Sequence, residues 1–470
     1  MGEGKYQTIA LLTLGCKLNY AETGTYERGF VQAGLKVVPW SRGADIFLVN
    51  TCSVTATSDA KSRNLIRKVH RVNPEACIVV TGCSAQLRRE EYESIPGVAR
   101  VFGCNEKSLV VPETLAIIQG RSGTEGLGNL STPSAPPRRE KCPLGDNRGR
   151  TPPGTGGAHS SLWEGSRSDD FPVPPCHSGN VFSAWSSGER TRSFLKVQDG
   201  CNNYCKYCTV PYARGESRNV PVAECVANAR KIAALGVKEI VLTGVNTGDF
   251  GRSTGESFLQ LLKELNGVEG IERYRISSIE PNLLTEEIVD WIASGTKFQP
   301  HFHIPLQTGS DELLERMGRH YDTRFFADKL AYVRKAMEGP GKPLVFFGID
   351  VMVGLPGETE ELFRRTVEFL EGVRPSFIHV FPYSRRPGTP AAEMDGQVSE
   401  GVKKERVAAL EELSSRLHAE FVEANRGVHE KVLFESTDRQ GFMEGYTGNY
   451  IRIRRPYEAA LSGKIVDVTI

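Results

Sequence analysis

In the first 120 residues, apolar positions form short continuous runs separated by amphipathic stretches. The runs are TIALLTLGC (residues 8–16), ADIFLVNTCSV (44–54) and CIVVTGC (77–83). Continuous apolar runs of this length are typical of strands buried on both faces of a parallel sheet, and the segments between them have helical character. We therefore predict a parallel α/β domain over residues 1–120.

A second series of strand-like runs recurs between helical stretches within residues 193–425. The runs are SFLKVQDG, EIVLTGVN, RYRISSIEP, FHIPLQTGS, VFFGIDVMVGLPGE and FIHVFPYS. Such repetition predicts a complete or partial β/α barrel, similar to a TIM barrel, with its chemistry at the carboxyl ends of the strands. An amphipathic helix follows over about 398–425, with Leu410, Leu413, Leu417 and Phe421 on its apolar face.

Two further segments differ in pattern. Residues 121–192 are rich in Gly, Pro, Ser and Arg, which predicts a disordered insertion or linker, and their Cys142 and Cys176 are expected to have no role. Residues 426–470 contain short alternating strands, which predict a small β-barrel. There Tyr450, Arg452 and Arg454 alternate with isoleucines, so we expect one strand face suited to RNA, or simply a solvated face.

Composition narrows the functional classes. The 58 Lys and Arg residues nearly balance 57 Asp and Glu residues, so contact with nucleic acid requires a local basic patch. The chain shows neither a cleavable leader nor an apolar run long enough to span a membrane, and we expect a cytoplasmic protein without membrane attachment. In that compartment the 11 cysteines stay reduced, which favours metal binding over disulfides.

Three cysteines lie close together in QDGCNNYCKYCTVPYARG: Cys201, Cys205 and Cys208. Three thiolates can hold a [4Fe–4S] cluster and leave its fourth iron open to another ligand. A zinc site is the alternative, but it needs a fourth ligand that this segment lacks.

Cys16, Cys52 and Cys83 each end an apolar run. Because the carboxyl ends of parallel strands share one edge of the sheet, these thiols are expected to converge, unless they are ordinary buried cysteines. Cys77, Cys104 and Cys225 fit neither set, and we expect them to be structural.

The spacing C-x3-C-x2-C, with Tyr207 before the last cysteine, closely resembles that of the radical S-adenosylmethionine (SAM) enzymes. The resemblance implies that SAM binds the open iron. Residues at later strand ends and turns are then candidates for SAM contacts, namely Tyr207, Gly244, Asn246, Glu280, Gln307, Arg319 and Asp350.

The segments TLGCKLNYAET, VNTCSVTATSDAKSRN and VTGCSAQ resemble the N-terminal domain of the methylthiotransferases, and the C-terminal barrel resembles their RNA-binding TRAM domain. The resemblance implies two [4Fe–4S] clusters held by the two cysteine sets, SAM, an electron donor such as flavodoxin or ferredoxin, and no catalytic side chain beyond the cluster ligands. Both cysteine sets must then face one substrate cavity.

Within that family, GCKLN and FPYSRRPGTPAA resemble the branch that modifies N6-threonylcarbamoyladenosine at position 37 of tRNA, in the anticodon loop. Tyr20, Thr23 and the Pro/Gly-rich insertion depart from the usual pattern. Three alternatives remain: modification of isopentenyladenosine or of a ribosomal protein side chain, an RNA-binding protein with a single cluster, and a radical SAM enzyme for a small metabolite.

Overall fold

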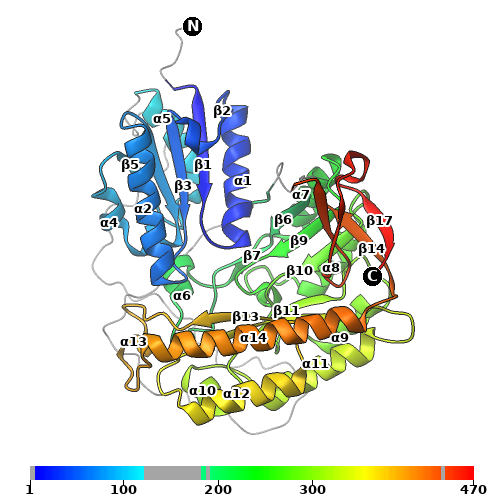
Figure 1. Ribbon diagram of the computed structural model, residues 1–470. Helices are drawn as coiled ribbons and strands as arrows, with labels where there is room; N and C mark the ends of the chain where they lie inside the picture. The colour runs from blue at the N-terminus through cyan, green and yellow to red at the C-terminus, as the bar shows by residue number, and fades with distance from the viewer. Residues whose placement is uncertain (1–5, 121–180, 187–190, 436–439) are drawn as a thin grey trace.

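The computed structural model describes residues 6–120, 181–186, 191–435 and 440–470. Its N-terminal part is a parallel sheet in the order β2-β1-β3-β4-β5 (Figure 1). The strands are β1 (Thr8–Thr13), β2 (Lys36–Val37), β3 (Ile46–Thr51), β4 (Cys77–Gly82) and β5 (Val98–Phe102). All six residues of β3 and of β4 are buried, as their apolar runs predict.

Helices cover both faces of this sheet. They are α1 (Lys17–Gln32), α2 (Ala56–Val72), α3 (Cys83–Leu87), α4 (Arg89–Glu93) and α5 (Val110–Ile118). Tyr26 and Phe30 of α1 pack in one core, whereas Ile66 and Val69 of α2 pack in the core on the opposite face. The predicted parallel α/β domain is confirmed.

The central part is a partial β/α barrel made of two parallel sheets, ordered β10-β9-β6 and β11-β12-β13. A bridge between Ser278 and His303 joins the sheets into one curved surface. The strands are β6 (Arg192–Lys196), β9 (Glu239–Thr243), β10 (Arg273–Ile276), β11 (His301–Gln307), β12 (Phe346–Val353) and β13 (Phe377–Pro382). Each coincides with a predicted run.

Helices and one short strand pair complete the barrel. The helices are α6 (Val210–Arg214), α7 (Val222–Ala234), α8 (Phe258–Asn266), α9 (Glu286–Ala293), α10 (Asp311–Arg316), α11 (Thr323–Met337), α12 (Glu360–Val373) and α13 (Pro390–Glu393). The pair β7 (Gln198–Asp199) and β8 (Arg218–Asn219) is antiparallel and brackets the close cysteines in sequence.

The long helix α14 (Glu400–Ala424) lies along β13 (Figure 1). Leu410, Leu413 and Leu417 enter the barrel core as expected, and Phe421 makes an edge contact with Phe346 at 5.6 Å between ring centroids. The predicted amphipathic helix is therefore confirmed, with its apolar face on the barrel.

The C-terminal part is an antiparallel sheet in the order β16-β15-β14-β17. Its strands are β14 (His429–Phe434), β15 (Phe442–Tyr446), β16 (Arg452–Pro456) and β17 (Ile465–Thr469). The sequence pattern did not indicate β15, because Glu444 and Gly445 interrupt its alternation. The glycine is required there, since a Cβ would lie 2.6 Å from Cγ1 of Val432.

Residues 181–186 pack onto the N-terminal domain and β6, although they belong to the segment that was expected to be a disordered linker. Phe182 stacks on Tyr26 at 5.4 Å, and Trp185 forms a bridge with Leu195. Cys142 and Cys176 lie outside the described residues.

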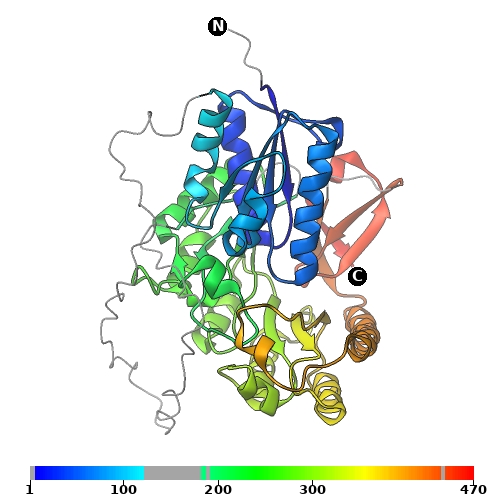
Figure 2. The same ribbon diagram turned by 90° about the vertical axis from the view of Figure 1, so that its left-hand side faces the viewer.

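The carboxyl edge of the N-terminal sheet faces the barrel, and the C-terminal sheet lies beside the barrel (Figure 2). The backbone N–H of Ala56 donates to Ser384 Oγ at 3.1 Å, and Arg386 Nη2 donates to Asp59 Oδ2 at 2.6 Å. Among the described residues, no helix is long and apolar enough to cross a membrane.

Candidate functional site

Cys16, Cys52 and Cys83 lie at the carboxyl ends of three neighbouring strands. Cys16 follows β1 and directly precedes α1, Cys52 follows β3, and Cys83 follows β4. The pKa of Cys52 is raised to about 12. Burial is the main cause, and the nearby thiols of Cys83 and, to a smaller extent, Cys16 add to it. Gly15 permits the approach, since a Cβ on it would lie 2.7 Å from Cβ of Cys52. The predicted convergence is therefore present.

A fourth thiol lies beside this set. Cys104 hydrogen-bonds to Cys83, and this bond is the main cause that lowers the pKa of Cys83 to about 6. Arg214 Nε also donates to Cys83 Sγ, at 3.0 Å. Cys104 was expected to be merely structural, yet it follows the end of β5 and so repeats the strand-end position of the other three.

Cys201, Cys205 and Cys208 lie on the loop between β7 and α6. The backbone N–H groups of Asn203 and Val210 each point at a sulfur, of Cys201 and of Cys208, at 3.4 Å. Burial raises the pKa of Cys201 to about 12 and also raises that of Cys208, and these two N–H donors oppose the rise. The donors favour the thiolate form, which is the form that binds iron. The loop therefore suits a cluster.

Arg319 connects the third sulfur of this loop to the predicted SAM contacts. Its Nη1 donates to Cys205 Sγ at 3.1 Å and to Tyr207 Oη at 3.5 Å, and its Nη2 forms an ion pair with Glu280. Tyr321 Oη accepts from Arg319 Nε at 3.1 Å. Tyr207, Glu280 and Arg319 thus form one contiguous group.

Gly244 and Asn246 lie beside that group on the turn after β9. Gln198 Oε1 accepts from the backbone N–H groups of Val245 and Asn246 at 2.9 Å each, and Asn246 Oδ1 accepts from the Glu280 N–H at 3.5 Å. A side chain at Gly244 would crowd Gln198, because a Cβ would lie 2.9 Å from its Oε1. Five of the seven candidate SAM residues are therefore brought together.

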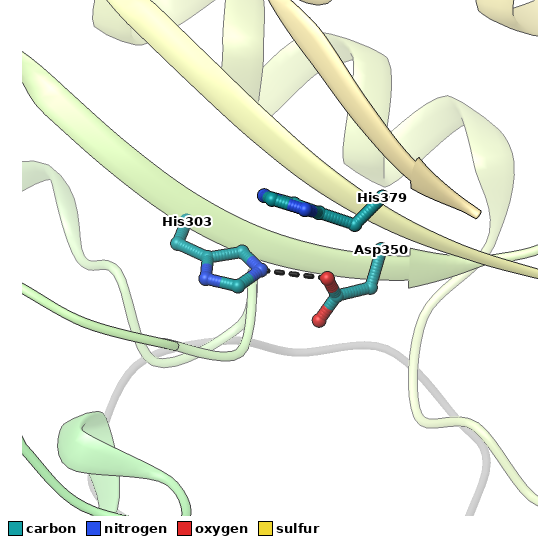
Figure 3. Close-up of side chains that lie close together, drawn as sticks. All are labelled: His303, Asp350 and His379. Carbon is teal, nitrogen blue, oxygen red and sulfur yellow. Dashed lines mark hydrogen bonds and ion pairs between the residues drawn. The ribbon is translucent and has the colours of Figure 1, made fainter. Parts of the chain in front are cut away.

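Within the described part of the chain, Gln307 and Asp350 form no hydrogen bond or ion pair with these five residues. Gln307 ends β11 with a positive φ of 74°. Asp350 lies instead with His303 and His379, which sequence reasoning did not single out (Figure 3). His303 Nε2 and Asp350 Oδ1 are 2.7 Å apart, and the centroids of the two histidine rings are 5.1 Å apart. Between the two histidine strands, β12 has Gly348 opposite His303, so no side chain there separates the rings.

Tyr450 lies where the C-terminal sheet meets the barrel. It stacks on Tyr446 at 4.8 Å, lies 4.6 Å from the His301 ring, and its hydroxyl accepts from Arg192 Nη1 at 3.2 Å. The expectation that Tyr450 shares a strand face with Arg452 and Arg454 is wrong. Its φ of 65° places it in a turn before β16 and directs its ring inward, whereas the two arginines are exposed.

A buried group of five charged residues joins the two cysteine sets. It consists of Glu22, Lys107, Lys196, Asp199 and Arg214, whose side chains are at most 5% exposed. Glu22 Oε1 accepts from Lys107 Nζ at 2.6 Å and from Lys196 Nζ at 2.9 Å. Asp199 Oδ1 accepts from Arg214 Nη1 at 2.9 Å. We name it the charge network.

The charge network spans the domain boundary, because Glu22 and Lys107 belong to the N-terminal domain and the others to the barrel. Asp199 precedes Cys201 by two residues, and Arg214 reaches Cys83. The two cysteine sets are therefore fixed relative to each other by buried ion pairs.

Comparison with known proteins agrees with this arrangement. Residues 195–370 match the Radical SAM superfamily, and residues 8–103 match uncharacterized protein family UPF0004. The structure of the radical S-adenosylmethionine methyltransferase TsrM from Kitasatospora setae, with cobalamin and a [4Fe-4S] cluster bound, superposes with a TM-score of 0.54 at 19% identity, over 82% of this chain and 74% of that one. At that identity it supports the fold alone.

Curated relatives match nearly the whole chain. Threonylcarbamoyladenosine tRNA methylthiotransferase MtaB of Bacillus subtilis is 37% identical over 98% of this chain and 93% of its own length. MtaB of Aquifex aeolicus is 34% identical over 98% and 100%. The tRNA-2-methylthio-N(6)-dimethylallyladenosine synthase of Pelotomaculum thermopropionicum is 30% identical over 98% and 94%. With both cysteine sets in place, this chain belongs to the radical SAM methylthiotransferase family.

Proposed function

We propose that this protein adds a methylthio group to carbon 2 of N6-threonylcarbamoyladenosine at position 37 of tRNA. The main supporting observation is that one buried arginine, Arg214, links the two three-cysteine sets. Arg214 lies on α6, which follows Cys208 in the chain, and it donates a hydrogen bond to Cys83. The MtaB relatives, named for this substrate, support the choice of base.

Both cysteine sets have the chemistry that a [4Fe–4S] cluster requires. We assign Cys16, Cys52 and Cys83 to one cluster and Cys201, Cys205 and Cys208 to the other. Three thiolates per cluster leave one iron free in each. When bound, the clusters and SAM supply the methylthio donor and the one-electron cleavage of SAM.

The chain's own groups have positioning roles. Arg319 holds Tyr207, Glu280 and Cys205 in one hydrogen-bonded unit. We propose that this unit and the Gly244 to Asn246 turn bind SAM. Gln198 fixes that turn through two N–H groups, so its backbone is preorganised for a ligand.

Substrate contact is proposed for the C-terminal sheet. Arg452 and Arg454 are exposed on β16 and available to phosphates of the anticodon loop, whereas Tyr450 faces the barrel beside Tyr446. We propose that the protein acts in the cytoplasm, where tRNA is modified, with a flavodoxin or ferredoxin as electron donor. The domains are proposed as residues 1–120, 193–425 and 426–470, with 121–192 as the insertion.

The test is mass spectrometry of nucleosides from bulk tRNA of a strain that lacks the gene. The 2-methylthio derivative of N6-threonylcarbamoyladenosine is expected to be absent and to return with wild type, but not with Cys16→Ala. Return of a methylthio isopentenyladenosine instead would favour the activity named for the Pelotomaculum relative. Unchanged tRNA in all strains would refute the proposal and direct the search to ribosomal proteins.

A further inference from the structure

Three polar side chains on neighbouring strands of the barrel have no role in the arrangement described so far. His303 of β11, Asp350 of β12 and His379 of β13 point toward one another from the same face of the sheet (Figure 3). The side chains of His303 and Asp350 are 21% and 20% exposed, and His379 is exposed. We call these three residues the His–Asp–His cluster. Its polar atoms remain accessible to a ligand.

Lys17 is the charged group that faces this cluster from the N-terminal domain. It is the first residue of α1 and follows Cys16 directly. Burial is the main cause that lowers the pKa of Lys17, and the Asp350 carboxylate is one of the groups that oppose this lowering. Burial is also the main cause that lowers the pKa of His301 and His379, and the nearby positive charge of Lys17 adds to it. The His–Asp–His cluster therefore lies close to the proposed ligand Cys16.

The ammonium of Lys17 has no ion-pair partner among the described residues. The Lys17 side chain is half-buried, and no carboxylate of the described residues comes within 4.0 Å of its Nζ. Neighbouring cations are neutralised: Arg192 pairs with Glu435 at 3.4 Å, and Arg275 with Glu239 at 2.9 Å. A half-buried cation that the described residues leave without a partner favours an anionic ligand, and the positive end of α1 adds to the attraction.

Two kinds of ligand suit the geometry. The ligand atoms of the three residues lie within 4.8 Å of one another, which suits a divalent cation. However, a divalent cation would add two positive charges beside Lys17 and would have Asp350 as its only carboxylate. An organic anion would instead be attracted to Lys17 and leave Asp350 free to accept a hydrogen bond. The charge distribution favours the anion.

We propose that Lys17 and the His–Asp–His cluster bind the threonylcarbamoyl group of the substrate base, with Lys17 on its carboxylate. This inference rests on the proposed function and deepens it. The group carries a carboxylate, N–H donors of a urea linkage, and a hydroxyl. Asp350 is placed to accept from a urea N–H, and His379 to bond the hydroxyl or the carbonyl oxygen.

The position of Lys17 beside Cys16 determines where a base bound by this contact would lie. Because it adjoins Cys16, a carboxylate held there brings the attached adenine next to the N-terminal cysteine set. A base that lacks the carboxylate would leave the Lys17 ammonium unpaired, so the contact also selects among bases.

The test measures binding of two anticodon stem-loop RNAs that differ only at position 37, carrying either threonylcarbamoyladenosine or unmodified adenosine. The full-length protein is reconstituted anaerobically, and affinity is read by fluorescence anisotropy with SAM present. Wild type is expected to prefer the modified RNA. Lys17→Met should weaken binding of that RNA by about 10- to 100-fold, the usual value of a charge-assisted hydrogen bond, and leave the other RNA unchanged.

One control variant and one second test variant complete the experiment. Lys36→Met removes an exposed lysine of β2 in the same domain and should change neither affinity. His379→Ala alters an exposed side chain and should reduce the preference for the modified RNA about 2- to 10-fold, even if Lys17→Met fails to assemble its clusters. Iron content and the visible spectrum report that assembly for every variant.

The outcomes separate the hypotheses. Retention of the full preference by Lys17→Met and His379→Ala overturns this inference and leaves the proposed function standing. Equal weakening of both RNAs by Lys17→Met assigns the lysine to a phosphate and also overturns it. One equivalent of zinc or manganese, lost in His379→Ala, shows a metal site instead. Failure of wild type to prefer the threonylcarbamoyl RNA overturns the inference alone, whereas failure of wild type to modify that RNA overturns both the inference and the proposed function.

Discussion

Replacing Glu22 by Gln tests the charge network most directly. Glu22 is fully buried, and its Oε1 accepts from Lys107, Lys196 and Arg214 at 2.6, 2.9 and 3.3 Å. Burial alone would raise the pKa of Glu22, but the three cations lower it from 4.5 to about 2. The folded state thus favours the carboxylate, and this stabilisation is complete above about pH 4.5 and lost as the pH falls toward 2.

The size of the effect follows from that shift. A lowering of the pKa from 4.5 to about 2 corresponds to about 3 kcal/mol at neutral pH. Removing one partner of a buried ion pair typically costs about 3–5 kcal/mol, because the remaining charges stay buried. The variant retains the size of the side chain but leaves three cations with the single carboxylate of Asp199. We therefore expect Glu22→Gln to lower the free energy of unfolding by about 3 kcal/mol.

The assay is anaerobic urea denaturation of the reconstituted protein at pH 7, followed by tryptophan fluorescence. Glu361→Gln is the matched control, since Glu361 forms an exposed pair with Arg365 on α12, and such pairs contribute less than about 1 kcal/mol. If Glu22→Gln and Glu361→Gln unfold with the same free energy, the charge network does not stabilise the domain junction and the reasoning is refuted.

Three further predictions concern the cysteine loops and the RNA surface. Gly200→Ala should abolish assembly of the Cys201 cluster, because Gly200 has φ of 77° and a Cβ would lie 1.9 Å from the Glu216 carbonyl oxygen; an unchanged iron content would contradict this. Cys104→Ala should retain both clusters but alter the electron paramagnetic resonance signal of the N-terminal one, since the hydrogen bond to Cys83 is lost; an unaltered signal would contradict it. Replacing Arg452 and Arg454 together by Ala should weaken tRNA binding and reduce its salt dependence by about 2 in the slope, measured by filter binding; equal slopes would refute the RNA assignment.

The backbone was largely predictable because most of the longer strands carry their own apolar runs, whereas β15 does not. Buried runs fixed the positions of β1, β3 and β4, and with them the common edge at which Cys16, Cys52 and Cys83 meet. The cysteines of the barrel loop were recognisable from spacing alone. In both cases the signal is local in sequence.

Contacts between distant segments were not predictable. Glu22 meets Lys196 and Arg214 across 174 and 192 residues, and no periodicity reports such partners. Lys196, a charged residue that directly follows the apolar Phe194 and Leu195 of β6, was the one available hint of a buried ion pair. Likewise, the inward ring of Tyr450 depends on a positive φ, which its alternating pattern concealed.

The central claim is that two separate cysteine sets hold two clusters in one enzyme. Iron determination on anaerobically reconstituted protein tests it, with wild type compared with the triple alanine variants of Cys16, Cys52 and Cys83, and of Cys201, Cys205 and Cys208. We expect about eight iron atoms per chain for wild type and about four for each triple variant. About four in wild type, unchanged when Cys16, Cys52 and Cys83 are removed, would contradict it.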